Sequence, residues 1–281
     1  MIALLGDPLV QRMLLVGVLV GAVAPIVGTY LVHRRMALMG DGVGHVALAG
    51  VAAGWLAGSA AGLAQRDALA LPGAVIFAIA GAIFIERMRS QGGAADVAMA
   101  ILFYGGIATG VLLIGIAGGS NANLLGYLFG SISTVRWLDV WVTVGLAVLI
   151  LVVGLGLRRA LFAVTHDQDF ARSTGLPVSV LNMIVAVLAA ITITAAMRVV
   201  GVLLVSALMI LPVAIAQQLT HSFNRTMVIA MVIGTVLTVT GIWITLYHNL
   251  QPGALIVVLG VIAYAVSAVG AMLLRRRKAN R

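Results

Sequence analysis

Residues 34–54, RRMALMGDGVGHVALAGVAAG, place an aspartate and a histidine inside an otherwise apolar segment long enough to enter a membrane. Asp41 and His45 are four residues apart, so on a helix both side chains leave the same face about one turn from each other. Ionisable residues in hydrocarbon usually face a bundle interior or a water-filled cavity. The spacing suits two ligands of one cation. The competing interpretation is that Asp41 caps a helix that begins near Gly42, while His45 packs against a neighbour.

The composition indicates a polytopic membrane protein. Of the 281 residues, 62% are hydrophobic and 9% are charged, whereas soluble domains carry about 25% charged residues. A span uses about 20 residues, so residues 1–281 are expected to form a single transmembrane domain with no room for a nucleotide-binding domain. Cysteine is absent, which excludes disulfides and thiolate metal sites.

The fold class expected is all-α, with eight or nine transmembrane helices. The apolar runs lie at residues 9–32, 37–58, 68–85, 94–117, 138–157, 178–196, 199–219, 227–247 and 254–274. The second run is interrupted by Asp41 and His45, and the sixth and seventh are separated by only two residues. Pro212 in the seventh run removes one helical hydrogen bond and is expected to kink that helix.

The positive charges predict the orientation. Thirteen of the seventeen lie in the gaps after the first, third, fifth and seventh runs and in the tail, so the N-terminus is expected outside and the C-terminus in the cytoplasm. The net charge of +9 is then explained by the orientation of the chain in the membrane, and it gives no reason to expect nucleic acid as a partner.

Two segments between the runs are neither spans nor ordinary loops. Residues 120–135, SNANLLGYLFGSISTV, predict an interfacial or re-entrant helix on the outer side. Residues 159–177, RALFAVTHDQDFARSTGLP, form the longest polar stretch inside the chain. Asp167 or Asp169 could cap a short helix there, ended by Gly175 and Pro177. Such a segment fits either a solvated loop or a docking surface for a partner.

Motifs for ATP binding and hydrolysis are absent. The sequence holds no GxxxxGK[ST], HExxH or GxSxG stretch, so we expect no enzymatic activity and no permanently bound cofactor. The remaining histidines, His33, His166, His221 and His248, lie at span ends or in polar gaps, where structural or solvated roles are expected.

The stretch RRMALMGDGVGHVALAG resembles the signature RRM-x3-GD-x2-(S/A)H-x-x-L-x-G of the ABC-3 family permeases, which are zinc, manganese and iron importers. Three further stretches are similar to the family in the same order: NLLGYLFGSI, HDQDFARSTGLP and VGVLLVSALMILPVAIAQQLT. Gly44 departs from the pattern, because members often carry serine or alanine there. This departure could loosen the helix at the site without removing a ligand.

The resemblance implies a type II ABC importer permease in a bacterial plasma (inner) membrane. It further implies a homodimer that works with two copies of a separate ATPase and with an external metal-binding protein. Matched residue by residue, the family's metal-path aspartate and histidine fall on Asp41 and His45. The ATPase-coupling segment falls on Asp169, Phe170, Ala171 and Gly175.

Residue chemistry leads to a similar picture. If Arg34 and Arg35 mark the inner interface, the helical rise places His45 about 15 Å deep, near the bilayer centre. One carboxylate and one imidazole per subunit, doubled by a two-fold axis, suit Zn²⁺ or Mn²⁺ as a transported ion. Zn²⁺ is the cargo preferred here, with Mn²⁺ and Fe²⁺ next, because histidine favours the borderline ion. ATP hydrolysis on the partner would drive alternating access through the loop around Phe170.

Two alternatives stay open. A secondary transporter would use Asp41 and His45 to relay protons without any ATPase, and copurification of an ATPase through residues 165–177 would argue against it. A siderophore or vitamin ABC permease should not need the Asp41 and His45 pair.

Overall fold

Long helices dominate the fold. The computed structural model describes residues 6–62, 68–92, 94–118, 126–130, 137–197, 200–248 and 250–279. The helices are α2 (Pro8–His33), α3 (Met39–Ala60), α4 (Ala70–Ser90), α5 (Ala95–Ile116), α7 (Trp137–Gly156), α8 (Arg158–His166), α9 (Gln168–Ser173), α10 (Val178–Ala196), α11 (Val202–Leu219), α12 (Phe223–Tyr247) and α13 (Pro252–Ala279).

The expected spans are confirmed as helices. In the described part of the chain, eight helices are long and apolar enough to cross a membrane, and α11 adds a shorter apolar helix over Leu204–Leu219. The largest differences from the expected bounds are five residues, at the ends of α4 and α13. Both helices continue through positions that carry basic residues in the sequence.

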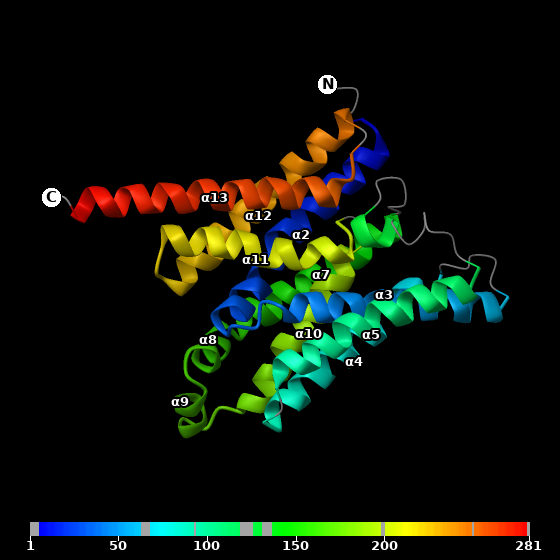
Figure 1. Ribbon diagram of the computed structural model, residues 1–281, viewed down its shortest axis with the longest axis horizontal. Helices are drawn as coiled ribbons and strands as arrows, with labels where there is room; N and C mark the ends of the chain where they lie inside the picture. Colours follow the sequence, from blue (N-terminus) through cyan, green and yellow to red (C-terminus); the bar gives the residue numbers. More distant parts are fainter. Residues whose placement is uncertain are drawn as a thin grey trace.

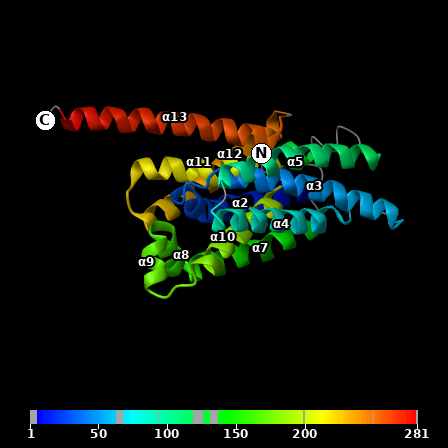
Figure 2. The same cartoon turned by 60° about the horizontal axis from the view of Figure 1, so that its bottom comes forward.

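Among the candidate spans, α2, α10 and α3 are the most deeply buried. The span windows of α2 and α10 are each 72% buried, whereas that of α13 is only 11% buried. Figures 1 and 2 show α13 along the outside of the bundle. Small residues bring the inner helices close, because a Cβ atom added to Gly21 of α2 would lie 2.8 Å from the carbonyl oxygen of Gly234 on α12.

The connections that carry the basic residues share one end of the bundle. Figure 1 shows α8, α9, the α11–α12 turn and the C-terminal end of α13 at the left, opposite the α3–α4 connection. α8, which begins with Arg158 and Arg159, and the start of α12, which contains Arg225, therefore lie on one side, as the sequence predicts. That this side faces the cytoplasm stays a prediction.

The opposite end carries the short link from α10 to α11. Gly201 in this link has φ +89°, and a side chain there would strike the backbone of Leu128 and Phe129. The predicted interfacial helix over residues 120–135 falls mostly outside the described residues. Within it, residues 126–129 are helical, and the Tyr127 ring lies 5.8 Å from that of Trp55.

Prolines stand inside two of the helices. α11 continues through Pro212, and a small cavity beside it is lined by α11, α12 and α13. α2 contains Pro25, whose carbonyl accepts a hydrogen bond from the Thr29 hydroxyl at 2.7 Å. Helices tolerate such prolines where neighbours or hydroxyls compensate the broken ladder. The kink at Pro212 stays a prediction.

Candidate metal site

Asp41 lies in the first turn of α3 and does not cap it. The helix begins at Met39, and its N-cap residue, Leu38, makes no side-chain capping bond. The interpretation of Asp41 as the cap of a helix beginning near Gly42 is therefore wrong. The Asp41 carboxylate instead accepts a hydrogen bond from the hydroxyl of Ser206 on α11. Gly40 permits this approach, because a Cβ atom there would lie 3.1 Å from that of Ser206.

His45 is buried one turn further along, with 2% of its surface exposed. Its Nδ1 lies 2.7 Å from the Asp41 carbonyl oxygen. Because a carbonyl only accepts, Nδ1 is the donor in this bond, and Nε2 is the ring nitrogen that remains for another partner. Histidines that bind metals are commonly oriented by this kind of bond. That Nε2 binds a cation stays a prediction.

Helix α5 holds His45 in place from the other side. The Phe103 ring lies 4.2 Å from the His45 ring, between centroids. A Cβ atom on Gly106 would lie 2.6 Å from the His45 carbonyl carbon, so only glycine fits there without a shift. The backbone that carries His45 is therefore in direct contact with α5.

Gly44, which departs from the family pattern, faces α11 and α10. A Cβ atom there would lie 3.2 Å from Val202 Cγ1, which is tight. α3 remains helical through this position. The glycine therefore matches a close neighbour, and the expected loosening of the helix is absent.

Asp41 and His45 remain the two predicted metal donors of this chain. In the described residues, no group of three or more His, Cys, Asp or Glu side chains could hold a metal ion. Ser206 was missed by the sequence analysis, although a hydroxyl within the apolar seventh run was a signal. Asp41 and His45 both lie in α3, one turn apart, as the spacing predicts, and their role as a pair of metal ligands stays a prediction.

The second predicted segment forms α9 and the turn that follows. Asp167, and not Asp169, caps the helix, because its Oδ1 accepts from the amides of Asp169 at 3.0 Å and Phe170 at 2.9 Å. Phe170 is 61% exposed. The other residues of the segment are Ala171, which is buried, and Gly175, which ends the turn with φ +81°. An exposed aromatic side chain on a capped helix is suited to docking.

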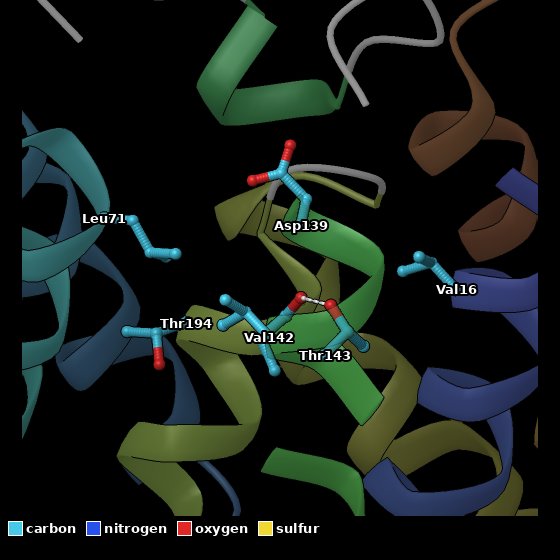
Figure 3. Close-up of a pocket in the computed structure, with 7 residues that line it drawn as sticks. Val16, Leu71, Asp139, Val142, Thr143 and Thr194 are labelled. Carbon is cyan, nitrogen blue, oxygen red and sulfur yellow. Dashed lines mark hydrogen bonds between the residues drawn. The ribbon is translucent and has the colours of Figure 1, made fainter. Parts of the chain in front are cut away.

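Asp139 is a buried carboxylate that the sequence analysis did not single out. It lies in the first turn of α7 with 8% of its surface exposed, beside a small cavity. Figure 3 shows its carboxylate pointing away from Thr143, whose hydroxyl donates to the Ala195 carbonyl at 3.4 Å. The cavity is walled by α2, α4, α7 and α10, whereas Asp41 and His45 contact α5 and α11.

Glu86 near the end of α4 is the second buried acid without an earlier signal. Arg89 binds it through two bonds, Nη2 to Oε1 at 2.7 Å and Nε to Oε2 at 3.1 Å. Burial lowers the pKa of the neighbouring Arg34 to about 10, helped by the charge of Arg89 and opposed by Glu86. Arg89 thus binds the carboxylate directly, and Glu86 acts on Arg34 only through its charge.

Comparison with known proteins identifies the family. The model of the ABC 3 transport family matches residues 6–271. The chain belongs to the ABC 3 transport family. It is 30% identical over 265 residues to the manganese transport system membrane protein MntC of Halalkalibacterium halodurans, covering 94% of this chain and 88% of that protein. It is 31% identical over 258 residues to the manganese import system permease protein ScaB of Streptococcus parasanguinis, covering 92% and 89%.

A solved structure agrees with this membership. PsaBC from Streptococcus pneumoniae in complex with Fab superposes on this ABC 3 chain with a TM-score of 0.82 at 29% identity, covering 95% of each chain. The resemblance seen in the sequence and the all-α importer-permease fold are thereby confirmed. This chain is a multi-pass transport permease of the metal ABC importer kind, and its ABC family argues against a secondary transporter.

Proposed function

We propose that this ABC 3 permease carries a divalent first-row metal ion across the membrane past Asp41 and His45. A carboxylate oxygen and an imidazole nitrogen suit Mn²⁺, Fe²⁺ and Zn²⁺. Both relatives described above carry manganese in their names, so Mn²⁺ is the first candidate. The preference for Zn²⁺ derived from the sequence is not supported by these relatives and ranks second.

One observation carries the proposal. The Asp41 carbonyl fixes the His45 ring so that Nε2 bears the lone pair, one helical turn from the Asp41 carboxylate. The two donors fall short of the four to six ligands that such ions usually take. A second copy of the chain, related by a two-fold axis, would supply two more.

The remaining parts of the transporter follow from the family. A separate ATPase would bind α9 through the exposed Phe170, with Asp169, Ala171 and Gly175 forming the same segment. An external binding protein would deliver the ion in a bacterial plasma membrane, with the C-terminus in the cytoplasm. ATP binding and hydrolysis would shift the permease between outward-open and inward-open states, and the ion would bind at Asp41 and His45 only in passing.

Uptake into proteoliposomes tests this function. The permease is reconstituted with its ATPase and binding protein, and ATP-dependent entry of radioactive Mn²⁺ and Zn²⁺ is measured for wild type, Asp41→Asn and His45→Gln. Each variant is expected to lose at least about tenfold in uptake, because each removes one metal donor. The better-transported ion identifies the cargo.

Asp96→Asn is the matched control, because Asp96 also lies in the first turn of a span but is exposed. It should transport like wild type. Uptake that survives both site substitutions, in complexes that assemble normally, would remove Asp41 and His45 from the path.

A further inference from the structure

A basic cleft of about 430 Å³ opens to solvent at the end of the bundle that carries α8 and α9. It lies between α8 and the start of α12, which Figure 1 places at the same end. Its lining is Arg158, Arg159, Phe162, His166, His221, Ser222, Phe223 and Asn224. The lining contains two arginines and two histidines but no acidic residue. The cleft is separate from the Asp41 and His45 site and has no role in the transport proposal.

The face of α8 that lines the cleft is set by its spacing. Arg158, Phe162 and His166 are four residues apart in turn, so they project from one side of the helix. Leu161 and Val164 are buried on the other side. Packing of the apolar side against the bundle therefore directs the cationic and aromatic residues into the cleft.

Aromatic rings form the floor. Phe223 is buried, and its ring lies 4.9 Å from that of Phe162 and 5.9 Å from that of His166. The His33 ring at the end of α2 lies 5.0 Å from Phe223 on its inner side. A floor packed from three helices holds the basic side chains around a fixed surface.

The positive charge of the cleft has no acidic partner among the residues that the structure describes. In the described part of the protein, Arg158 and Arg159 form no ion pair. The acids of the neighbouring α9 are already engaged, since Asp167 caps that helix and Asp169 lies 3.7 Å from Arg172. Ser222 does not cap α12 with its side chain, so the first amides of this long helix add to the positive potential.

The surroundings favour an amphiphile over a soluble anion. Leu155 and Leu157, where α7 passes into α8, are 38% and 39% exposed, and Leu219 before the α11–α12 turn is 64% exposed. Apolar surface that would meet acyl chains thus adjoins cationic side chains that would meet a head group. Arginine binds phosphate oxygens in pairs, and basic pockets between membrane helices bind anionic head groups.

We propose that this cleft binds the phosphodiester head group of an anionic lipid, with Arg158 and Arg159 on the phosphate and His221 and Asn224 at the rim. Phosphate is the chemistry recognised, and a free phosphate is the competing source. Binding here does not require metal transport, so it can be measured when the transport proposal fails.

Native mass spectrometry of the purified full chain in neutral detergent tests the site. Phosphatidylglycerol is titrated into wild type and the double variant Arg158→Gln/Arg159→Gln, and the dissociation constant of the first bound lipid is measured. The double variant should bind about thirtyfold more weakly, because it removes two cations from the phosphate. Arg158→Lys/Arg159→Lys keeps the charge and should retain most of the affinity.

Arg87→Gln is the matched control, because Arg87 is an exposed arginine in the last turn of α4 that does not line the cleft. It should bind like wild type. Equal lipid affinity in wild type and the double variant overturns the proposal. An equal loss of lipid affinity in Arg87→Gln also overturns it, because the lipid would then respond only to the total charge of the protein. If an equal concentration of inorganic phosphate displaces the lipid, the cleft is a site for free phosphate, and the proposal of a lipid ligand is wrong.

A single exposed substitution covers the case in which the double variant fails to fold. His221→Glu places a negative charge at the rim and should weaken phosphatidylglycerol binding, whereas His248→Glu, after the far end of α12, should not. If the His221→Glu variant binds the lipid normally but no longer copurifies with the ATPase, the cleft belongs to a protein partner and the lipid proposal is wrong.

Discussion

The Ser206 hydroxyl is the residue-scale contact that orients the Asp41 carboxylate. Ser206→Ala should raise the apparent KM for metal uptake roughly threefold to tenfold, because a hydrogen bond of this kind contributes about 1 kcal/mol. The maximal rate should change less, since both metal donors remain. The measurement is initial uptake as a function of metal concentration.

Ser267→Ala provides the comparison for Ser206→Ala. Its hydroxyl also lies in a span, on α13, and donates to the Tyr264 carbonyl at 2.8 Å. An unchanged KM in Ser206→Ala would show that Asp41 does not depend on this donor.

Two acid–arginine pairs with the same i, i+3 spacing are expected to differ in their contribution to stability. Glu86 and Arg89 are paired at 2.7 Å with side chains 3% and 23% exposed, whereas Asp169 and Arg172 are 3.7 Å apart and largely exposed. Glu86→Gln should destabilise the protein by about 2 kcal/mol, because it leaves Arg34 and Arg89 facing each other without a counter-charge. Asp169→Asn should change stability by less than about 0.5 kcal/mol. Thermal melting in detergent compares them, and equal losses would contradict the argument.

The contact between α3 and α5 is the decisive feature at the scale of elements. Gly106 of α5 meets the His45 backbone, whereas Gly105 beside it has nothing within 4 Å of an added Cβ atom. Gly106→Ala should force the helices apart, with a loss of about 1–3 kcal/mol of stability and a fall in uptake. Gly105→Ala should be neutral or slightly stabilising. A Gly106→Ala variant that melts and transports like wild type would show that α5 can move away freely.

Element positions were largely predictable from the sequence, because an apolar run of about 20 residues has few options in a bilayer. The competing interpretation, in which a helix begins near Gly42 with Asp41 as its cap, is wrong. Arg35 adopts φ +56° in the turn after α2, and the chain reverses tightly enough for helix to begin at Met39. Asp41 is therefore already inside the helix, and its amide-capping role is lost.

Contacts between different helices could not be predicted from patterns in the sequence. Ser206 and Asp41 are 165 residues apart, and no periodicity links them. The effect of the Arg89 and Glu86 charges on Arg34 likewise joins residues that lie more than 50 positions apart in the sequence. By contrast, the Asp41 and His45 pair and the short helix after Asp167 were predicted because each depends on spacing within one helix.

At the scale of the whole molecule, several outer helices expose apolar faces that lipid or a second copy must cover. α5 is next to the metal site and exposes Tyr104 at 71%, while α13 exposes Val266 at 67%. If a second copy completes the site, α5 should lie near the two-fold axis and α13 should face lipid.

Single cysteines test this arrangement directly, because the natural chain contains none. Tyr104→Cys should form a covalent dimer on mild oxidation or with a short bifunctional maleimide in membranes. Val266→Cys should remain monomeric under the same conditions. Gel electrophoresis without reductant reads the result, and the reverse pattern would place the interface on α13.

The bond between Ser206 and Asp41 also has a consequence for biosynthesis. α3 has the lowest mean hydropathy of the candidate spans, 1.4 against 2.4 for α13, so it is the span least able to partition into lipid by itself. The hydrogen-bond donor of the Asp41 carboxylate, Ser206, is synthesised 165 residues later in the chain. At 5–20 residues per second, the ribosome needs roughly 10 to 30 s to supply it. During that interval the nascent α3 must be sheltered by α2, α4 and α5 or by the insertion machinery, which makes this segment the point where membrane insertion and final assembly are coupled.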